Sequence, residues 1–339
     1  MPNFFFDLTS SEQRDLLNIG ASRLGMQPFL LEKDVWVCWA LDKLFSMPGK
    51  LKMAFKGGTS LSKVYKAIDR FSEDIDITID FREFAPTLTG RESRSKLNKL
   101  SNFLKGEVLS YTKQLVRPYI ENCLKDQFGS GYGNTELSSD GEKLYIHYES
   151  VLDVPKAGYI SPSVLLEFGG RNVTEPHERH IVKPYLIPVS SEVLYPQPTV
   201  TVLAMERTYW EKATLIHAEC RRSQTRADLS RISRHWYDLF KMSGNLEPYR
   251  TGSMYSLLVQ VVQQKVAFYQ SSSAGYDDCL NGSLRLVPGA SLRAALENDF
   301  VEMQSAGMFY INPPSFEEIL DCLHDVENEL NGFISERAK

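Results

Sequence analysis

Two aspartates separated by a single residue, Asp74 and Asp76, carry the strongest chemical signal in the sequence. They lie in the run Asp-Ile-Asp-Ile-Thr-Ile-Asp (74–80), in which polar and apolar residues alternate strictly. Because successive side chains of a β-strand point to opposite faces, this pattern predicts a strand with both carboxylates on one face, their Cα atoms about 7 Å apart. Carboxylates placed in this way can hold a pair of divalent ions for in-line phosphoryl or nucleotidyl transfer. Oxygen ligands of this kind favour Mg²⁺ or Mn²⁺.

A glycine pair, Gly57 and Gly58, precedes these aspartates and is followed by Thr59 and Ser60. Glycine has no Cβ, so its backbone can approach a phosphate closely, and the N–H groups at a helix start favour an anion. The Ser60 hydroxyl adds a donor. The sequence therefore predicts a phosphate site and a metal site at the two ends of one short helix. It matches neither a P-loop nor a dinucleotide-binding fingerprint. Taken alone, each half is equally compatible with a plain turn or a solvated sheet face.

A third carboxylate, Glu167, lies late in the apolar run Val164–Phe168. Burying a charge without a partner is costly, so this side chain must meet water, a partner or a metal. We predict that Glu167 completes the metal site begun by the two aspartates. The alternatives are a strand-end residue that faces solvent, or one that pairs with Arg171.

Two further charged residues, Lys212 and Asp238, lie in apolar surroundings. Lys212 shares a helix face with Met205, Tyr209 and Ile216, so it either extends its ammonium to the surface or reaches into a cleft. In a cleft it could hold triphosphate oxygens and offset transition-state charge. Asp238 is surrounded by aromatic residues and needs a partner, for which Lys212 is the candidate. The alternative for both is a plain buried salt bridge that joins two helices.

Two stretches of the chain are locally basic and could follow a phosphate backbone. The first, residues 91–105, contains Arg91, Arg94, Lys96, Lys99 and Lys105. The second, residues 221–234, contains Arg221, Arg222, Arg226, Arg231 and Arg234, which we predict to bind RNA. The alternative for each stretch is a solvated helix face.

The remaining pattern indicates which elements position these residues. Apolar periodicity predicts helices at 11–26, 31–45, 60–68 and 91–118 and then at 203–220, 230–243, 252–269, 290–305 and 315–334. Strands are expected at 51–55, 74–80, 144–151 and 164–168, a glycine- and serine-rich loop at 128–142, and short extended pieces in the proline-rich segment 171–200. Ser315 and Glu318 form the pattern of a helix capping box. The sequence thus predicts an α/β (α+β) core over residues 1–200 and a helical domain over 201–339.

Composition excludes several classes of protein. With 339 residues, 42% hydrophobic and 24% charged, the chain is neither mainly disordered nor collagen-like. The five cysteines are scattered, which argues against a disulfide framework and for a reducing cytoplasm. No apolar run is long enough for a membrane span, and the start lacks the basic region of a signal peptide. Because the net charge is −5, any nucleic-acid contact must come from local patches.

Taken together, these motifs resemble those of the AbiEii-type nucleotidyltransferase toxins. The likeness covers roughly residues 25–245, in the right order, and is carried by Glu32–Trp36, Lys56–Lys63, Arg70–Asp76, Arg207–His217 and Arg234–Leu239. The glycine pair with the spaced aspartates is shared with the wider polymerase-β-like nucleotidyltransferases. The Trp-Glu-Lys and Tyr-Asp-Leu motifs make the resemblance more specific.

This resemblance implies a polymerase-β-like core with a mixed sheet, and a helical C-terminal domain that contributes Lys212 and Asp238 to the site as essential residues. It implies that Asp74 and Asp76 bind Mg²⁺. The predicted nucleotide-binding residues are Gly57, Gly58, Thr59, Ser60, Lys63 and Lys212. Members of the family are toxins of toxin–antitoxin or abortive-infection phage-defence systems, and some transfer nucleotides from an NTP to the 3′ end of tRNA. The usual partner is a separately encoded antitoxin.

Three other functions remain open at this level. The same core could modify a protein or a small molecule in place of RNA. A nuclease with two metal ions would share the spaced aspartates but would need no NTP. A catalytically silent binding module would show no Mg²⁺-dependent binding of NTP.

Overall fold

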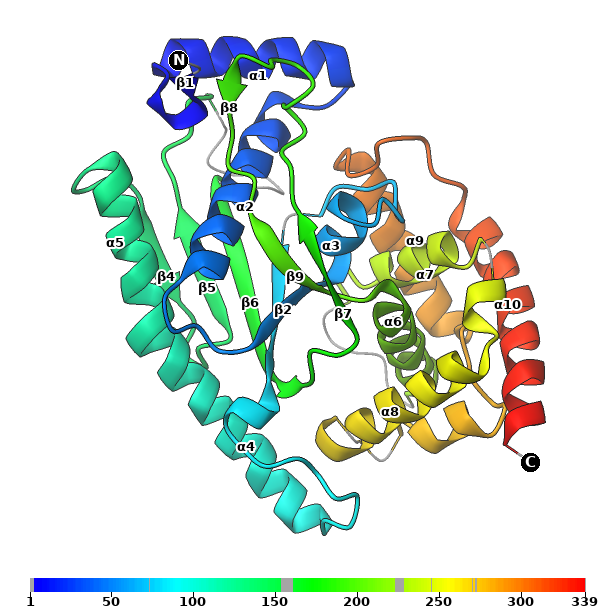
Figure 1. The fold of residues 1–339 in the computed structure, drawn as a ribbon. Coiled ribbons are helices and arrows are strands. Elements are labelled where there is room, and N and C mark those ends of the chain that lie inside the picture. Colours follow the sequence, from blue (N-terminus) through cyan, green and yellow to red (C-terminus); the bar gives the residue numbers. More distant parts are fainter. Residues whose placement is uncertain are drawn as a thin grey trace. The chain divides into compact units, whose positions relative to one another are not determined.

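The computed structural model describes residues 3–72, 74–153, 161–222, 229–244, 246–269, 271 and 273–338. The chain forms two compact units (Figure 1). The first comprises Met1–Val64, Ser72–Thr87 and Leu100–Leu203, and the second comprises Tyr65–Phe71, Leu88–Lys99 and Ala204–Lys339. The second unit therefore takes two short segments from the earlier part of the chain, which the division of the sequence near residue 200 did not include.

A mixed seven-stranded sheet forms the centre of the first unit, with the strand order β4-β5-β6-β3-β2-β9-β7. The strands are β2 (Met53–Lys56), β3 (Asp74–Asp80), β4 (Asn134–Leu137), β5 (Lys143–His147), β6 (Ser163–Asn172), β7 (His177–Ile181) and β9 (Thr199–Leu203). The β3–β6 and β2–β9 pairs are parallel and the other pairs are antiparallel. Two short strands, β1 (Asn3–Phe4) and β8 (Val193–Leu194), pair separately. The predicted mixed α/β fold is confirmed.

Helices pack on this sheet because their apolar faces match those of the strands. In β3, Ile75, Ile77 and Ile79 are at most 1% exposed, as the alternating pattern requires. Helix α2 lies across one face of the sheet and contacts β6 and β9 (Figure 1). The helical elements that begin in this part of the chain are η1 (Phe5–Asp7), α1 (Ser10–Leu24), α2 (Pro28–Ser46), α3 (Gly57–Lys63), η2 (Phe81–Glu83), α4 (Arg94–Tyr111), the π-helix η3 (Thr112–Val116) and α5 (Arg117–Phe128).

The second unit is helical in its described part. Its elements are α6 (Met205–Cys220), α7 (Arg234–Met242), η4 (Glu247–Tyr249), α8 (Gly252–Phe268), η5 (Tyr276–Leu280), α9 (Ala290–Ser305) and α10 (Phe316–Arg337). The predicted capping box of α10 is present, because Ser315 accepts from the Glu318 backbone and the Glu318 side chain accepts in return. No helix within the described ranges is long and apolar enough to cross a membrane.

Three predicted elements differ from the structure. The short helix begins at Gly57 and ends at Lys63, because the chain turns at Lys66, which has a positive φ of 50°. The helix expected over 91–118 is interrupted by a π-helical turn and continues to Phe128. The loop expected over 128–142 contains the edge strand β4, whose four residues lack an alternating pattern and gain their hydrogen bonds by pairing with β5.

Candidate active site

The two central carboxylates lie where the alternation of β3 predicts. Asp74 and Asp76 are partly exposed, whereas the intervening Ile75 is buried, so the aspartates share the more open face of the strand. In the neighbouring antiparallel strand, Lys56 is the register partner of Asp76. The next residue after Lys56 is Gly57, so the glycine turn lies beside the carboxylates.

Gly57 lies directly against Asp76. Its φ is +77°, in the left-handed region that favours glycine. A Cβ built on Gly57 would overlap the Asp76 carboxylate and would lie 2.7 Å from its Cγ. The Thr59 hydroxyl donates to the main-chain oxygen of Asp74 at 2.6 Å, which ties α3 to the same strand. The predicted phosphate and metal positions are therefore adjacent at the start of α3, and the prediction that they lie at its two ends is corrected. The antiparallel pairing of β2 with β3 brings them together.

Replacing Gly57 with Ala is expected to lower the nucleotidyl transfer that the motifs predict at least ~10²-fold, because displacing the predicted metal-binding carboxylate of Asp76 would cost roughly this much. The added methyl group must displace the Asp76 carboxylate, and the alanine must adopt a left-handed φ. Transfer rates of Gly57→Ala and of the matched control Gly49→Ala test this. Gly49 also has a positive φ, of 68°, but a Cβ there meets nothing within 4 Å. Equal activity in the two variants would show that close contact with Asp76 is not needed.

The hydroxyl and amine groups near the glycine turn have partners within the protein. Ser60 is fully buried, and its hydroxyl donates to the Gly57 carbonyl at 2.9 Å. The side chain of Lys63 is 3% exposed and forms an ion pair with Asp34 on α2. Its ammonium also lies 4.1 Å from the centre of the Tyr185 ring. These contacts do not favour the predicted nucleotide contact of Lys63, since its charge is neutralised inside the first unit.

Glu167 lies beside the aspartates in the sheet. It is the register partner of Asp76 in the parallel neighbour β6, so the two side chains share a face. Its carboxylate pairs with Lys143 at 3.1 Å, and the hydrogen bond that the Lys143 ammonium donates to it raises the pKa of Lys143. Arg171, the alternative partner, pairs instead with Glu142 at 3.4 Å. Within the described ranges, no three His, Cys, Asp or Glu side chains are grouped closely enough to hold one metal ion.

In the second unit, Lys212 and Asp238 form the ion pair that the sequence predicts. The Lys212 ammonium on α6 lies 2.8 Å from Oδ2 of Asp238 on α7. The same ammonium lies 3.3 Å from Nδ1 of His235. Asp238 is fully buried, and Lys212 is 7% exposed.

Arg70 is a member of this cluster that sequence reasoning missed. Its Nε and Nη2 donate to the two oxygens of Asp238 at 2.7 and 2.8 Å, a bidentate contact. Arg70 is 2% exposed and belongs to the motif Arg70–Asp76, but its partner lies 168 residues away in the sequence. An arginine in a run with apolar neighbours, Ile68 and Phe71, is the only sequence signal for this contact.

The three charged groups set one another's protonation. Burial alone would raise the pKa of Asp238, but the charges of Arg70 and Lys212 outweigh it and hold that pKa below its ordinary value. Burial lowers the pKa of Lys212, and the nearby Arg70 lowers it further, whereas Asp238 opposes this. Burial and the charge of Lys212 lower the pKa of His235 well below its ordinary value. His235 is therefore neutral at pH 7 and can accept a hydrogen bond from Lys212.

Two arginines of the second basic stretch form ion pairs within the second unit. Arg221 pairs with Asp278 at 2.5 Å and Arg222 with Glu219 at 2.8 Å. The backbone N–H of Arg231 donates to Asp299 at 2.5 Å, and Arg234 begins α7. Arg226 lies outside the described residues. Because carboxylates neutralise the first two side chains, this stretch offers less positive charge to RNA than its composition predicts.

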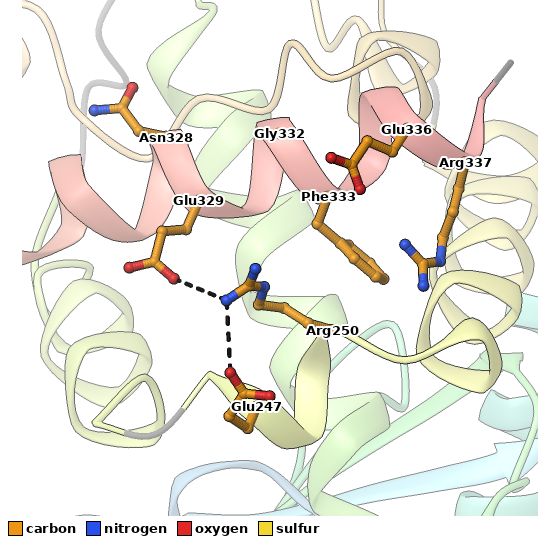
Figure 2. Close-up of a pocket in the computed structure, with 8 residues that line it drawn as sticks. All are labelled: Glu247, Arg250, Asn328, Glu329, Gly332, Phe333, Glu336 and Arg337. Atoms are coloured by element: carbon orange, nitrogen blue, oxygen red, sulfur yellow. Dashed lines mark hydrogen bonds and ion pairs between the residues drawn. The ribbon is translucent and has the colours of Figure 1, made fainter.

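A pocket of about 360 Å³ lies elsewhere in the second unit, beside α10. Figure 2 shows Arg250 held between Glu247, at 3.7 Å, and Glu329, at 3.4 Å. The Arg337 guanidinium lies 4.1 Å from the centre of the Phe333 ring. None of the predicted site residues lines this pocket.

Comparison with protein families agrees with the sequence motifs. The family model described as "Nucleotidyl transferase AbiEii toxin, Type IV TA system" matches residues 39–322. Among solved structures, MenT4, a nucleotidyltransferase toxin from Mycobacterium tuberculosis, aligns over 97% of this chain and 98% of its own, with 17% identity and a TM-score of 0.44. No curated protein matches the sequence.

Proposed function

Because the chain belongs to the AbiEii nucleotidyl transferase toxins of type IV toxin–antitoxin systems, we propose that it transfers a nucleotide from an NTP to an RNA 3′ end, such as that of tRNA, with Mg²⁺. The observation that carries this proposal is the contact of Gly57 with Asp76, on the strand that also presents Asp74. At this turn the backbone can approach a phosphate closely. The two carboxylates beside the turn can hold a divalent ion.

The donor set fits the metal. Asp74 and Asp76 supply carboxylate oxygens from one face of β3, and hard oxygen ligands are those that Mg²⁺ and Mn²⁺ prefer. A bound ion would lower the pKa of the attacking hydroxyl and offset the charge on the phosphates. Lys143 contacts Oε1 of Glu167, so Glu167 could join this set through its other carboxylate oxygen. Its role as a third ligand remains a prediction.

The residues of the chain have separable roles in the proposed reaction. The backbone from Gly57 to Ser60 lies against the phosphates, where only a glycine leaves room for Asp76. Lys212 supplies positive charge to the triphosphate, and Asp238 fixes its ammonium. The acceptor hydroxyl releases its proton to solvent and its oxygen bonds to the α-phosphorus. The bond between the α-phosphorus and the bridging oxygen breaks, and pyrophosphate leaves.

For the RNA contact, the first basic stretch is a better candidate than the second. Lys96 and Lys99 are exposed on α4, and neither has a carboxylate partner among the described residues. They lie three residues apart, so they share a helix face. Arg221 and Arg222, by contrast, are paired with Asp278 and Glu219.

We expect Lys96→Ala/Lys99→Ala to weaken RNA binding and to reduce the slope of log Kd against log salt by about 1.5, since each phosphate contact contributes about 0.7–0.9. The matched variant Arg221→Ala/Arg222→Ala should change the slope less. Fluorescence anisotropy with labelled tRNA over a salt series measures both. A larger loss of slope in the arginine variant would return the RNA contact to the second stretch.

Incubation of the protein with Mg²⁺, each labelled NTP and separate RNA, protein and small-molecule acceptors tests the proposed function. Label on RNA supports the proposal and identifies the base. Label on another acceptor keeps the enzyme class and replaces the acceptor. Shortened RNA in the absence of NTP would indicate a nuclease, and an absence of Mg²⁺-dependent NTP binding would indicate a silent module.

Membership of the family also indicates the biological system in which the protein acts. A type IV toxin–antitoxin system implies an antitoxin partner and an NTP substrate. We propose that the antitoxin is separately encoded, that the protein acts in the cytoplasm and that the system contributes to defence against phage. Expression with and without a candidate antitoxin, followed by growth and phage-plaque counts, tests the antitoxin partner and the role in defence.

A further inference from the structure

The buried charge cluster of the second unit holds two cations and one carboxylate. Arg70, Lys212 and Asp238 are 2%, 7% and 0% exposed, so water screens them little. His235, the remaining titratable group in contact with Lys212, is neutral, as the lowering of its pKa indicates. The cluster therefore carries a surplus of one positive charge, and burying an unbalanced charge is costly unless an anion joins it.

The charge of Arg70 is matched by the carboxylate of Asp238, and three of the five guanidinium N–H groups are engaged within the protein. Each of its three guanidinium nitrogens already donates within the protein, two of them to Asp238 and Nη1 to the Phe71 carbonyl at 3.1 Å. Its backbone is fixed as well. Phe71 N–H donates to the Met308 carbonyl at 2.7 Å, and Tyr310 N–H donates to the Asp69 carbonyl at 3.0 Å.

Lys212 is the group through which the surplus charge can act. Its ammonium has three N–H donors. One contacts Asp238 at 2.8 Å and another faces the ring nitrogen of His235 at 3.3 Å. Within the described part of the chain the third N–H has no partner, so it is available to an anionic oxygen.

We propose that Arg70 is a positioning residue that neutralises Asp238, so that the charge of Lys212 remains available for an NTP phosphate. This inference rests on the proposed function, because it takes the triphosphate as the anion. Without Arg70, the carboxylate of Asp238 would neutralise Lys212 completely. NTP binding should then weaken even though Lys212 is intact.

The test compares Mg²⁺–NTP affinity in wild type, Arg70→Met and Arg70→Met/Asp238→Asn. We expect Arg70→Met to weaken binding about tenfold or more, as loss of one charged hydrogen bond would. The double variant removes the neutralising carboxylate and leaves Lys212 charged, although without the contact that positions its ammonium. It should therefore bind NTP several-fold more tightly than Arg70→Met and less tightly than wild type. If Arg70 only supported the fold, the double variant would bind NTP more weakly than Arg70→Met, because the second substitution would destabilise the protein further.

Two further variants keep the outcome decisive. Arg207→Met removes another arginine of the second unit that is 1% exposed, paired with Glu211 at 3.1 Å, and should leave NTP affinity unchanged. Arg70→Lys keeps the charge but loses the bidentate contact, so it should bind NTP more tightly than Arg70→Met, and it provides a second comparison if Arg70→Met proves unstable. Wild-type affinity in Arg70→Met, or no recovery in a folded double variant, would overturn the inference. Absence of NTP binding in the wild type would instead refute the proposed function.

Discussion

Substitution of Asp76 by Asn is expected to reduce nucleotidyl transfer by about 10³-fold or more, because loss of a carboxylate that we propose to bind the metal would remove several kcal/mol of transition-state stabilisation. The two side chains have nearly the same shape, so the contact with Gly57 can persist. Asp76 lies on the more open face of β3 and not in its buried row of isoleucines, so the fold should be retained. Transfer from labelled NTP, with a thermal unfolding curve for each protein, measures both effects.

The matched control for this variant is Asp140→Asn, in a turn of the first unit. The Asp140 carboxylate accepts a hydrogen bond from the Ser138 hydroxyl at 2.5 Å. The control variant should retain full transfer activity. A folded Asp76→Asn protein with wild-type activity would mean that the spaced aspartates are only a solvated strand face, and the proposed chemistry would fall with them.

Substitution of Lys212 by Met is expected to lower kcat/KM by about 10²-fold or more, comparable to the loss of one preorganised donor to developing charge. Truncating one partner of a buried ion pair usually destabilises the fold by about 3–5 kcal/mol, because the other charge is left alone. Here Asp238 keeps its bidentate contact with Arg70. The variant should therefore remain folded while it loses activity.

Steady-state kinetics and direct NTP binding separate the two effects of Lys212→Met. Weaker NTP binding is expected together with a lower kcat, because the ammonium is proposed to contact the phosphates before and during transfer. Lys265→Met on α8, where the ammonium lies 5.2 Å from the centre of the Tyr269 ring, is the control and should keep wild-type kinetics. An unfolded Lys212→Met protein would favour the plain salt bridge that sequence reasoning left open.

Local patterns in the sequence are sufficient to predict those structural elements whose formation depends only on residues close together in the chain. The strict alternation from Asp74 to Asp80 predicts β3, because a strand with one buried face has a period of two. Ser315 and Glu318 predict the start of α10, because a capping box involves only residues three apart. The ion pair of Lys212 with Asp238 could also be predicted, since each needs a partner in apolar surroundings.

The contacts that were missed join residues far apart in the chain. The approach of Gly57 to Asp76 depends on the antiparallel register of β2 with β3. The partner of Arg70 is 168 residues away, and that of Lys63 is on the earlier helix α2. The pairing of Arg221 with Asp278 likewise depends on how η5 packs against α6. The sequence shows where the charged residues lie along the chain but not which of them pair with one another.

The most direct test of the account follows the two ends of the NTP separately. The protein is incubated with tRNA, Mg²⁺ and the same NTP labelled either at the α- or at the γ-phosphorus, with Asp76→Asn alongside. Nucleotidyl transfer predicts α-label on the tRNA, γ-label in free pyrophosphate and neither product in the variant. Label from the γ-phosphorus on the tRNA, or equal transfer in the wild type and the variant, would contradict it.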